Sequence, residues 1–300
     1  MDDVNLTYSF NQGPRENSED DFGSVMLTLP MINEHKMTVA VVADGVGGNN
    51  YGEIASKSAV KDIKAYLAAV FSDPFIQSEP VDMVSKNIRS LLIESFKSAN
   101  NRILRQIKET PSLKGMSTTL VCALIFNNTL YVAWAGDSRC YLYRRETLRQ
   151  LTADHSEIQR LIDAGLINSK DAKSHPLAHT IYSYIGIKDG LVVGTGTYPL
   201  FTGDVVIICT DGLTDVVLDE TITDYVWQYK KGKFSFNNLP AFLVKQALAQ
   251  QTMDNVTVVC LEYQSDLQHK PELFDVMPMS LYPTKMAKTM KYFNKEFSNG

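Results

Sequence analysis

Five uninterrupted apolar residues lead directly into Asp44 in the segment VAVVADGVGGNNYGE, residues 39–53. An apolar run without alternation is typical of a strand that is covered on both faces, and we predict such a strand over residues 37–43. An unpaired carboxylate is very costly to bury in a protein core. Asp44 is therefore expected where the strand ends, at the edge of the sheet.

Three further aspartates stand at the ends of strand-like runs. Asp211 follows the run in VVIICTDGLTD, Asp137 ends the run in YVAWAGDSR, and Asp254 precedes the run in MDNVTVV. A turn or a helix cap explains any one of them. Gathered at one end of a sheet, however, they would form an acidic hollow whose repulsion needs cations, and hard divalent ions such as magnesium or manganese suit carboxylate and carbonyl oxygens.

The glycines after Asp44 do not form a phosphate loop. The segment lacks the Gly-Lys-Ser/Thr of a P-loop, and Asn50 replaces the last glycine of a GxGxxG pattern. Glycine instead lets the backbone pass close to an ion and offer it a carbonyl oxygen. The charged segment RENSEDD, residues 15–21, has two interpretations: a solvated loop, or a phosphate-binding Arg15 beside a carboxylate metal ligand.

The rest of the chain alternates between paired helices and short strands. Apolar residues recur at helical spacing over residues 53–71 and 84–107, and Asn127-Asn128 suggests a tight hairpin between two strands. Ser156 is a plausible cap for a short helix that ends near Gly165. Further strands are expected at 191–197, 204–209 and 255–263, and further helices at 219–230 and 239–250. This order favours antiparallel sheet with helices packed on it, an α+β domain.

Composition excludes several classes of protein. The net charge of −5 argues against a general nucleic-acid binder. The amino terminus shows no basic-then-apolar pattern, so we expect no secretion, and no apolar run approaches the roughly 20 residues of a membrane span. The four cysteines are far apart and lie in apolar runs, which is typical of reduced, buried thiols. We therefore expect a cytoplasmic protein.

Seven motifs occur in one order: RENSEDD, ADGVGG, GMSTTL, AGDSR, TADHS, CTDGLTD and MDNVTVV. Their order and separations resemble those of the metal-dependent serine/threonine protein phosphatases of type 2C (the PPM family), and ADGVGG is most similar to the bacterial branch. The resemblance runs from about residue 6 to residue 263. It implies a four-layer α-β-β-α sandwich, with two antiparallel β-sheets flanked by helix pairs and a metal site in a cleft at one edge.

The resemblance also implies a set of metal ligands. Asp44 should bridge two ions, and Gly45 should offer its carbonyl oxygen to one of them. Asp211 and Asp254 should hold the other ion. A third, weaker ion, as in many bacterial members, would use Asp137 and Asp211, with Asp215 as a further candidate.

The remaining site residues carried over from the family lie near the amino terminus. Glu19, with Asp20, should support the metal cluster directly or through water, and Arg15 should bind the substrate phosphate. The implied reaction is hydrolysis of phosphoserine and phosphothreonine in proteins by direct attack of a metal-bridging water or hydroxide, with two Mn²⁺ or Mg²⁺ ions. Such an enzyme would act as a monomer in signalling and would oppose a serine/threonine kinase.

Some positions depart from the family pattern or are given no chemical role. Where some members have a histidine that is proposed as general acid, this chain has Val46, which cannot donate a proton. Metal-bound water would have to protonate the leaving group instead. His155 is interpreted as structural, and His175 and His179 as plain parts of a mobile flap over about residues 156–185.

Two alternative functions stay open from the sequence. One is a catalytically weak family member that regulates by binding phosphoproteins, which the intact set of acidic residues argues against. The other is a metal phosphohydrolase that acts on small molecules, because substrate choice depends on the flap and the cleft walls.

The predicted domain organisation is a catalytic domain over residues 1–264, a linker over 265–284 and a tail over 285–300. On a helical wheel the tail is amphipathic, with methionine and phenylalanine on one side and lysine largely on the other. It fits a helix packed on the catalytic domain, a helix that docks a partner, or a helix on a membrane surface.

Overall fold

The computed structural model describes residues 2–29, 35–46, 51–168 and 175–265 of the 300-residue chain. Every described helix and strand belongs to the first unit of the chain, Met1–Asp266. The tail over 285–300 and all but the first residue of the expected linker lie outside the described residues. Within the described ranges, no helix is both long enough and apolar enough to cross a membrane.

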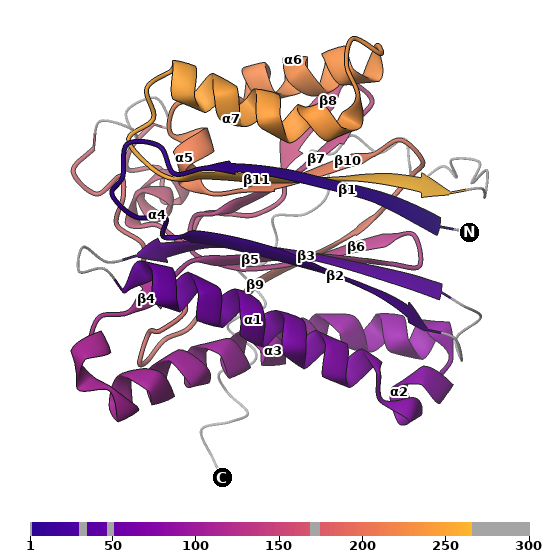
Figure 1. Ribbon diagram of the computed structural model, residues 1–300, viewed down its shortest axis with the longest axis horizontal. Helices are drawn as coiled ribbons and strands as arrows, with labels where there is room; N and C mark the ends of the chain where they lie inside the picture. Colours follow the sequence, from indigo (N-terminus) through magenta and orange to yellow (C-terminus); the bar gives the residue numbers. More distant parts are fainter. Residues whose placement is uncertain (1, 30–34, 47–50, 169–174, 266–300) are drawn as a thin grey trace. The chain divides into compact units, whose positions relative to one another are not determined.

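Two antiparallel sheets form the centre of the first unit (Figure 1). One sheet has the strand order β1-β11-β10-β7-β8, with bounds Asp2–Asn11, Val256–Ser265, Val205–Cys209, Arg139–Arg144 and Thr147–Gln150. The other has the order β2-β3-β5-β6-β9, with bounds Asp20–Leu29, His35–Val46, Leu120–Phe126, Thr129–Ala135 and Gly194–Pro199. The short β4 (Ser117–Thr118) pairs with the end of β3, at the edge of the sandwich where the acidic residues lie.

Helices cover the outer face of each sheet, which gives the expected four-layer α-β-β-α sandwich (Figure 1). The β2–β3 sheet carries α1 (Gly52–Phe71), α2 (Pro74–Ser78) and α3 (Val81–Glu109). The β1–β11 sheet carries α6 (Asp219–Lys230) and α7 (Leu239–Ala249). Two shorter helices, α4 (Glu157–Asp163) and α5 (Asp211–Thr214), lie in connections between strands.

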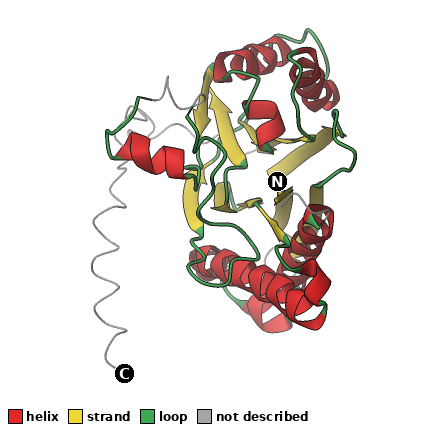
Figure 2. Cartoon of the chain, turned by 90° about the vertical axis from the view of Figure 1, so that its left-hand side faces the viewer, coloured by secondary structure: helices red, strands yellow, loops and turns green. Residues whose placement is uncertain are grey.

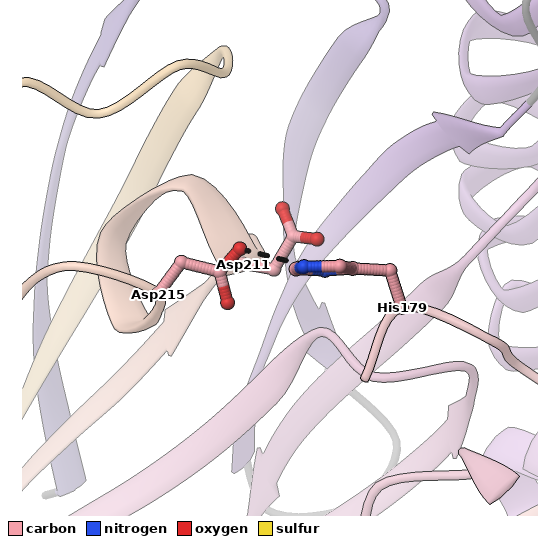
Figure 3. A group of neighbouring side chains, drawn as sticks. All are labelled: His179, Asp211 and Asp215. Atoms are coloured by element: carbon pink, nitrogen blue, oxygen red, sulfur yellow. Dashed lines mark ion pairs between the residues drawn. The ribbon is translucent and has the colours of Figure 1, made fainter. Parts of the chain in front are cut away.

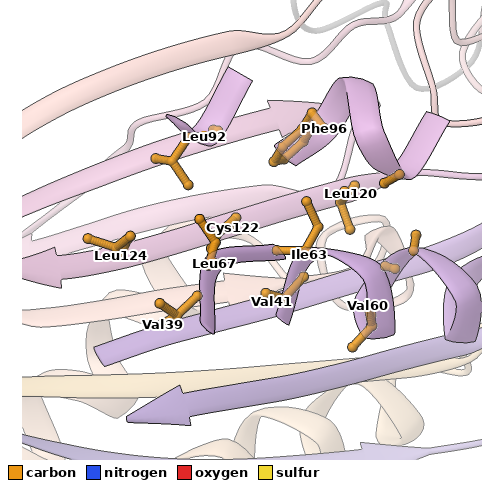
Figure 4. Close-up of a cluster of buried hydrophobic side chains, with 14 of the residues drawn as sticks. Val39, Val41, Val60, Ile63, Leu67, Leu92, Phe96, Leu120, Cys122 and Leu124 are labelled. Atoms are coloured by element: carbon orange, nitrogen blue, oxygen red, sulfur yellow. The ribbon is translucent and has the colours of Figure 1, made fainter. Parts of the chain in front are cut away.

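Continuous apolar strands are required because both of their faces are buried. In β3, Val39 and Val41 pack with α1 and α3, whereas Ala40 and Val42 face the opposite sheet. Figure 4 shows the first of these layers, in which Ile63 and Phe96 approach the strand. A third cluster joins the other sheet to α6 and α7. Apolar side chains fill the faces of both sheets, and polar side chains are therefore found at the strand ends.

Several local predictions are confirmed. Asn127 and Asn128 both adopt positive φ in the β5–β6 hairpin, as a two-residue turn of this kind requires. The Ser156 hydroxyl caps α4 by accepting a hydrogen bond from the backbone N–H of Gln159. All four cysteines are buried and form no disulfide.

The expected strand at 191–197 is displaced in the structure. It begins at Gly194 as β9, which pairs with β6 so that Gly194 lies opposite Trp134. A Cβ atom at Gly194 would lie 2.2 Å from the indole ring of Trp134. Pairing therefore starts at a position that must be glycine, because the ring occupies the space that a side chain would need.

Candidate active site

Acidic side chains from five parts of the chain gather at one edge of the sandwich, the edge that Figure 2 faces. Asp44 lies near the end of β3 and is directly opposite Asp20, the first residue of β2. Asp211 is the first residue of α5, immediately after β10, and Asp254 lies just before β11. Asp137, in the connection between β6 and β7, lines one cavity together with Asp44, Asp211 and Asp254. The expected acidic hollow is therefore present.

Asp20 is buried and held on one side only. Its Oδ2 atom accepts hydrogen bonds from the hydroxyls of Thr210, at 2.9 Å, and Thr257, at 2.7 Å. Its Oδ1 atom is buried without a hydrogen-bond partner. Burial raises the pKa of Asp20 to about 7, and the nearby Asp211 adds to the shift. This oxygen without a hydrogen-bond partner can coordinate a cation.

The backbone of Asp44 is fixed so that its side chain lies in the acidic cluster. Its N–H donates to the Thr119 hydroxyl at 3.0 Å, and its carbonyl accepts from the Thr119 N–H at 2.8 Å and from the Thr118 hydroxyl at 2.8 Å. Burial raises the pKa of the Asp44 carboxyl well above its usual value, and the carboxylates of Asp211 and Asp20 raise it further.

The pKa values of Asp137 and Asp211 are raised for the same reasons, burial and neighbouring carboxylates. Burial raises the pKa of Asp137 to about 8, with Asp211 as the next cause. Burial also raises the pKa of Asp211 to about 6, helped by Asp215. Asp211 Oδ1 is a second buried carboxylate oxygen that has no hydrogen-bond partner. Carboxylates arranged in this way, with bare oxygens and mutual repulsion, fit hard divalent cations.

Gly45 packs too closely for any side chain. Its N–H donates to the carbonyl of Glu19 at 3.1 Å, and a Cβ atom at this position would lie 2.4 Å from the backbone of Gly52. Gly47 and Gly48, the other two glycines of the segment, lie outside the described residues. The glycine after Asp44 thus lets β3 and the start of α1 meet beside the acidic cluster.

Asn255 attaches the amino-terminal loop to the site. Its buried side chain accepts from the N–H of Glu19 at 2.7 Å and donates to the carbonyls of Gln12, at 2.6 Å, and Asn17, at 3.1 Å. These contacts join segments that are more than 230 residues apart in the sequence. They hold Glu19 beside the cavity, and with it the loop that carries Arg15.

Arg15 reaches the acidic cluster from this loop. One of its terminal nitrogens lies 2.5 Å from Asp254 Oδ2, and its Nε donates to the carbonyl of Met253 at 3.1 Å. Half of the side chain is exposed. A guanidinium that is fixed on one side and open on the other can still bind an anion in the cavity.

His179 also lies at the cluster, although its place in the sequence indicated no chemical role. Figure 3 shows its ring beside Asp211 and Asp215, and one possible ligand atom from each residue lies within 4.8 Å of the others. His179 Nδ1 is 3.8 Å from Asp215 Oδ2. By contrast, His175 accepts a local hydrogen bond from the N–H of Leu177. No spacing pattern links His179 to the aspartates, because the connection between α4 and β9 brings them together only in the folded chain.

His155 is enclosed by rings and takes no part in the cluster. Its imidazole lies between Trp134, at 5.9 Å, and Tyr182, at 5.3 Å, between ring centroids. Burial lowers its pKa to about 4, so the ring is neutral at physiological pH. These contacts agree with the structural role expected from the sequence.

Two adjoining cavities open at this edge. A smaller one, of about 180 Å³, is lined by the acidic cluster together with Arg15, Val46 and His179. A larger one, of about 610 Å³, continues from the same aspartates toward α4 and the loop before β11. The smaller cavity is of the right size for ions and a phosphoryl group, and Val46 offers no proton there.

Residues 17–251 match the sequence profile of the family described as Protein phosphatase 2C. The chain belongs to this family. The phosphatase is 31% identical over 230 residues to the serine/threonine phosphatase stp of Listeria welshimeri, covering 77% of this chain and 86% of the relative. It is also 31% identical over 235 residues to the protein phosphatase PhpP of Streptococcus pneumoniae, covering 78% and 89%.

A solved structure with the same fold contains metal. It is the catalytic domain of the serine/threonine protein phosphatase PstP in complex with two manganese ions, with a TM-score of 0.71 and 27% identity, covering 88% of this chain and all of that one. The fold, the relatives and the acidic cluster together identify a bacterial-type, metal-dependent protein serine/threonine phosphatase, which acts on phosphoproteins.

Proposed function

We propose that this phosphatase hydrolyses phosphoserine and phosphothreonine with two divalent ions, Mn²⁺ or Mg²⁺, bound at the acidic edge. Asp44 would hold both ions, the Gly45 carbonyl one of them, and Asp211 and Asp254 the other. The observation that carries the proposal is the pair of buried carboxylate oxygens without partners, on Asp20 and Asp211, inside a cluster whose negative charges repel one another. Two cations satisfy both oxygens and charges.

The residues of the chain bind the phosphoryl group and hold the metal ligands in place. When bound, the ions neutralise the phosphoryl oxygens and lower the pKa of a water between them. Arg15 binds the phosphoryl oxygens with the open side of its guanidinium. The hydroxyls of Thr210 and Thr257 fix Oδ2 of Asp20, which would leave Oδ1 to support the metal cluster together with Glu19. Val46 gives no proton, so solvent in the site protonates the leaving group.

We further propose a third, weaker ion at Asp137, Asp211 and Asp215. The raised pKa values of Asp137 and Asp211 support it, because a cation relieves the repulsion between these groups.

The proposed catalytic domain covers residues 1–264, with a flap over about 156–185. In this proposal the protein is a cytoplasmic, monomeric signalling phosphatase that opposes a serine/threonine kinase, and residues 285–300 dock a partner or a membrane surface.

Replacing Arg15 with alanine tests the phosphate site. The expected result is a fall in kcat/KM on a phosphothreonine peptide of roughly 10²-fold, because one charged donor to the transferring group is lost. The rise in melting temperature caused by Mn²⁺ should persist, since Arg15 is not a metal ligand. Arg102→Ala, which removes only a surface contact to Asp62, is the control. Unchanged peptide hydrolysis in Arg15→Ala would remove Arg15 from the mechanism.

Metal should stabilise the protein more at high pH than at low pH. The folded-state pKa values of Asp20, about 7, and Asp137, about 8, lie above the ordinary value of an aspartate. The folded, metal-free protein therefore binds more protons than the unfolded chain, and its stability falls as pH rises from about 4 to about 8. Mn²⁺ replaces those protons. Thermal melts with Mn²⁺ and with chelator should differ more at about pH 8 than at about pH 5.5, and an equal difference at both would contradict this.

A further inference from the structure

The larger cavity extends the active site over the surface on which a substrate chain must lie. It shares Arg15 and three aspartates with the smaller cavity, and its volume is about 610 Å³ against about 180 Å³. Beyond the shared residues, one wall comes from the flap, with Ser156 and Ile158, and the other from Val216 and the loop before β11. A phosphoryl group at Arg15 therefore leaves most of this cavity to the residues that flank the phosphorylated side chain.

Met253 lines the larger cavity next to Arg15, which lines both cavities. Its side chain is 74% exposed, whereas its own carbonyl accepts the hydrogen bond from Arg15 Nε at 3.1 Å. A methionine this exposed is unpaired apolar surface, and the next residue, Asp254, is itself in the acidic cluster. Because the Met253 carbonyl contacts Arg15, this side chain is within reach of a peptide whose phosphate binds Arg15.

The loop that carries Met253 is anchored on both sides. The buried Thr252 hydroxyl donates to the carbonyl of Gly212 at 2.9 Å, and the Thr252 N–H donates to the carbonyl of Ala247 at 3.1 Å. On the following side, Asp254 is held by Arg15. Met253 is thus presented by a fixed backbone, while its unbranched thioether side chain can adapt to apolar groups of different shape.

Apolar and charged residues share the lining of this cavity. Ile158 of α4 and Val216, after α5, contribute apolar surface together with Met253, and these three residues are called the apolar subsite. Of the three, only Met253 is exposed, since Ile158 is buried and Val216 is half-buried. Contact between this subsite and an apolar substrate residue removes surface from water, which is favourable, whereas an acidic residue there would be repelled by the aspartates of the same lining.

We propose that Met253 is a specificity-determining residue and that it selects phosphoproteins with an apolar side chain within two residues of the phosphoserine or phosphothreonine. Met253 contacts that neighbouring side chain and not the reacting atoms. This inference rests on the proposed place of the phosphate at Arg15. The subsite accepts leucine, methionine or phenylalanine alike, because methionine adapts its shape, and it disfavours aspartate and glutamate.

A peptide series measures the preference directly. Each phosphothreonine peptide carries leucine, glycine or aspartate at one of the four nearest positions and is otherwise identical, and kcat/KM is measured with Mn²⁺. Wild-type protein should prefer leucine over glycine by about tenfold at one or more positions, as expected for one apolar contact of this size. A ratio near one at all four positions, with hydrolysis intact, overturns the inference and leaves the proposed function standing.

Two substitutions assign the preference to Met253. In Met253→Ser the leucine-to-glycine ratio should fall toward one, and in Met253→Lys the aspartate peptide should become preferred over the glycine peptide. Each ratio is taken within one variant, so loss of folded protein does not affect it. Met26→Ser is the matched control, because Met26 is 71% exposed, lies on β2 and does not line the cavity. Ratios unchanged in both Met253 variants overturn the inference, whereas failure of wild-type protein to hydrolyse any peptide with Mn²⁺ overturns the proposed function itself.

Discussion

Asp44→Ala is expected to lower kcat on a phosphoserine peptide by roughly 10³-fold while the protein still folds. The loss follows because Asp44 is the one carboxylate assigned to both ions. Folding is retained because the substitution removes a buried acid whose neighbours, Asp211 and Asp20, raise its pKa by repulsion. The metal-free variant should therefore melt at a temperature no lower than that of the metal-free wild type.

The matched control for Asp44→Ala is Asp224→Ala, which removes an exposed aspartate from α6. Phosphate release from the peptide and thermal melting with Mn²⁺ are measured for both variants. The control should keep its turnover and its stabilisation by Mn²⁺, and Asp44→Ala should lose both. Turnover by Asp44→Ala close to that of the wild type would rule out its assigned role.

Asn255→Ala is expected to destabilise the protein by about 3 kcal/mol, because three hydrogen bonds of a buried side chain are lost and the Glu19 N–H is left without its partner. Activity of the fraction that remains folded should also fall, because the same side chain holds the loop that carries Arg15. Urea unfolding gives the first quantity and kcat/KM on a phosphopeptide gives the second.

The contrast for Asn255→Ala is Asn11→Ala, which removes one exposed hydrogen bond, to the N–H of Gly13, from the same loop. Its cost should stay below about 1 kcal/mol. A destabilised Asn255→Ala protein with normal kcat/KM would show that Asn255 supports the fold without positioning Arg15. An equal loss of stability in the two variants would contradict the inference that Asn255 attaches the amino-terminal loop to the site.

The sequence predicts the layers of this fold well because burial leaves a periodic record. The apolar run before Asp44 and the helical spacing over 84–107 both correspond to elements of the structure, β3 and α3. Two strands at the amino terminus, β1 and β2, were not predicted, although Val4 and Leu6 alternate with polar residues in β1 and pack against the inner core. Their side chains alternate between exposed and half-buried, which is a weaker signal than a continuous apolar run.

The candidate site was less accessible to residue-level reasoning. Strand-end position alone indicated an acidic hollow at Asp44, Asp137, Asp211 and Asp254, but the division of these residues between ions came from the family resemblance. Contacts between distant segments produce no recognisable spacing in the sequence. Asn255 binds a loop more than 230 residues away, and His179 lies near Asp215 only in the folded chain. Such residues are found from the folded chain.

The central claim is that divalent ions at the acidic edge are required for hydrolysis, and one assay tests it most directly. Phosphate release from phosphoserine and phosphothreonine peptides is measured after chelator treatment, and again after Mn²⁺ is restored. The account predicts no release above background in chelator and full recovery with Mn²⁺, because the ions are needed to activate water and to neutralise the phosphoryl oxygens at the acidic edge. Release that continues undiminished in chelator would contradict it.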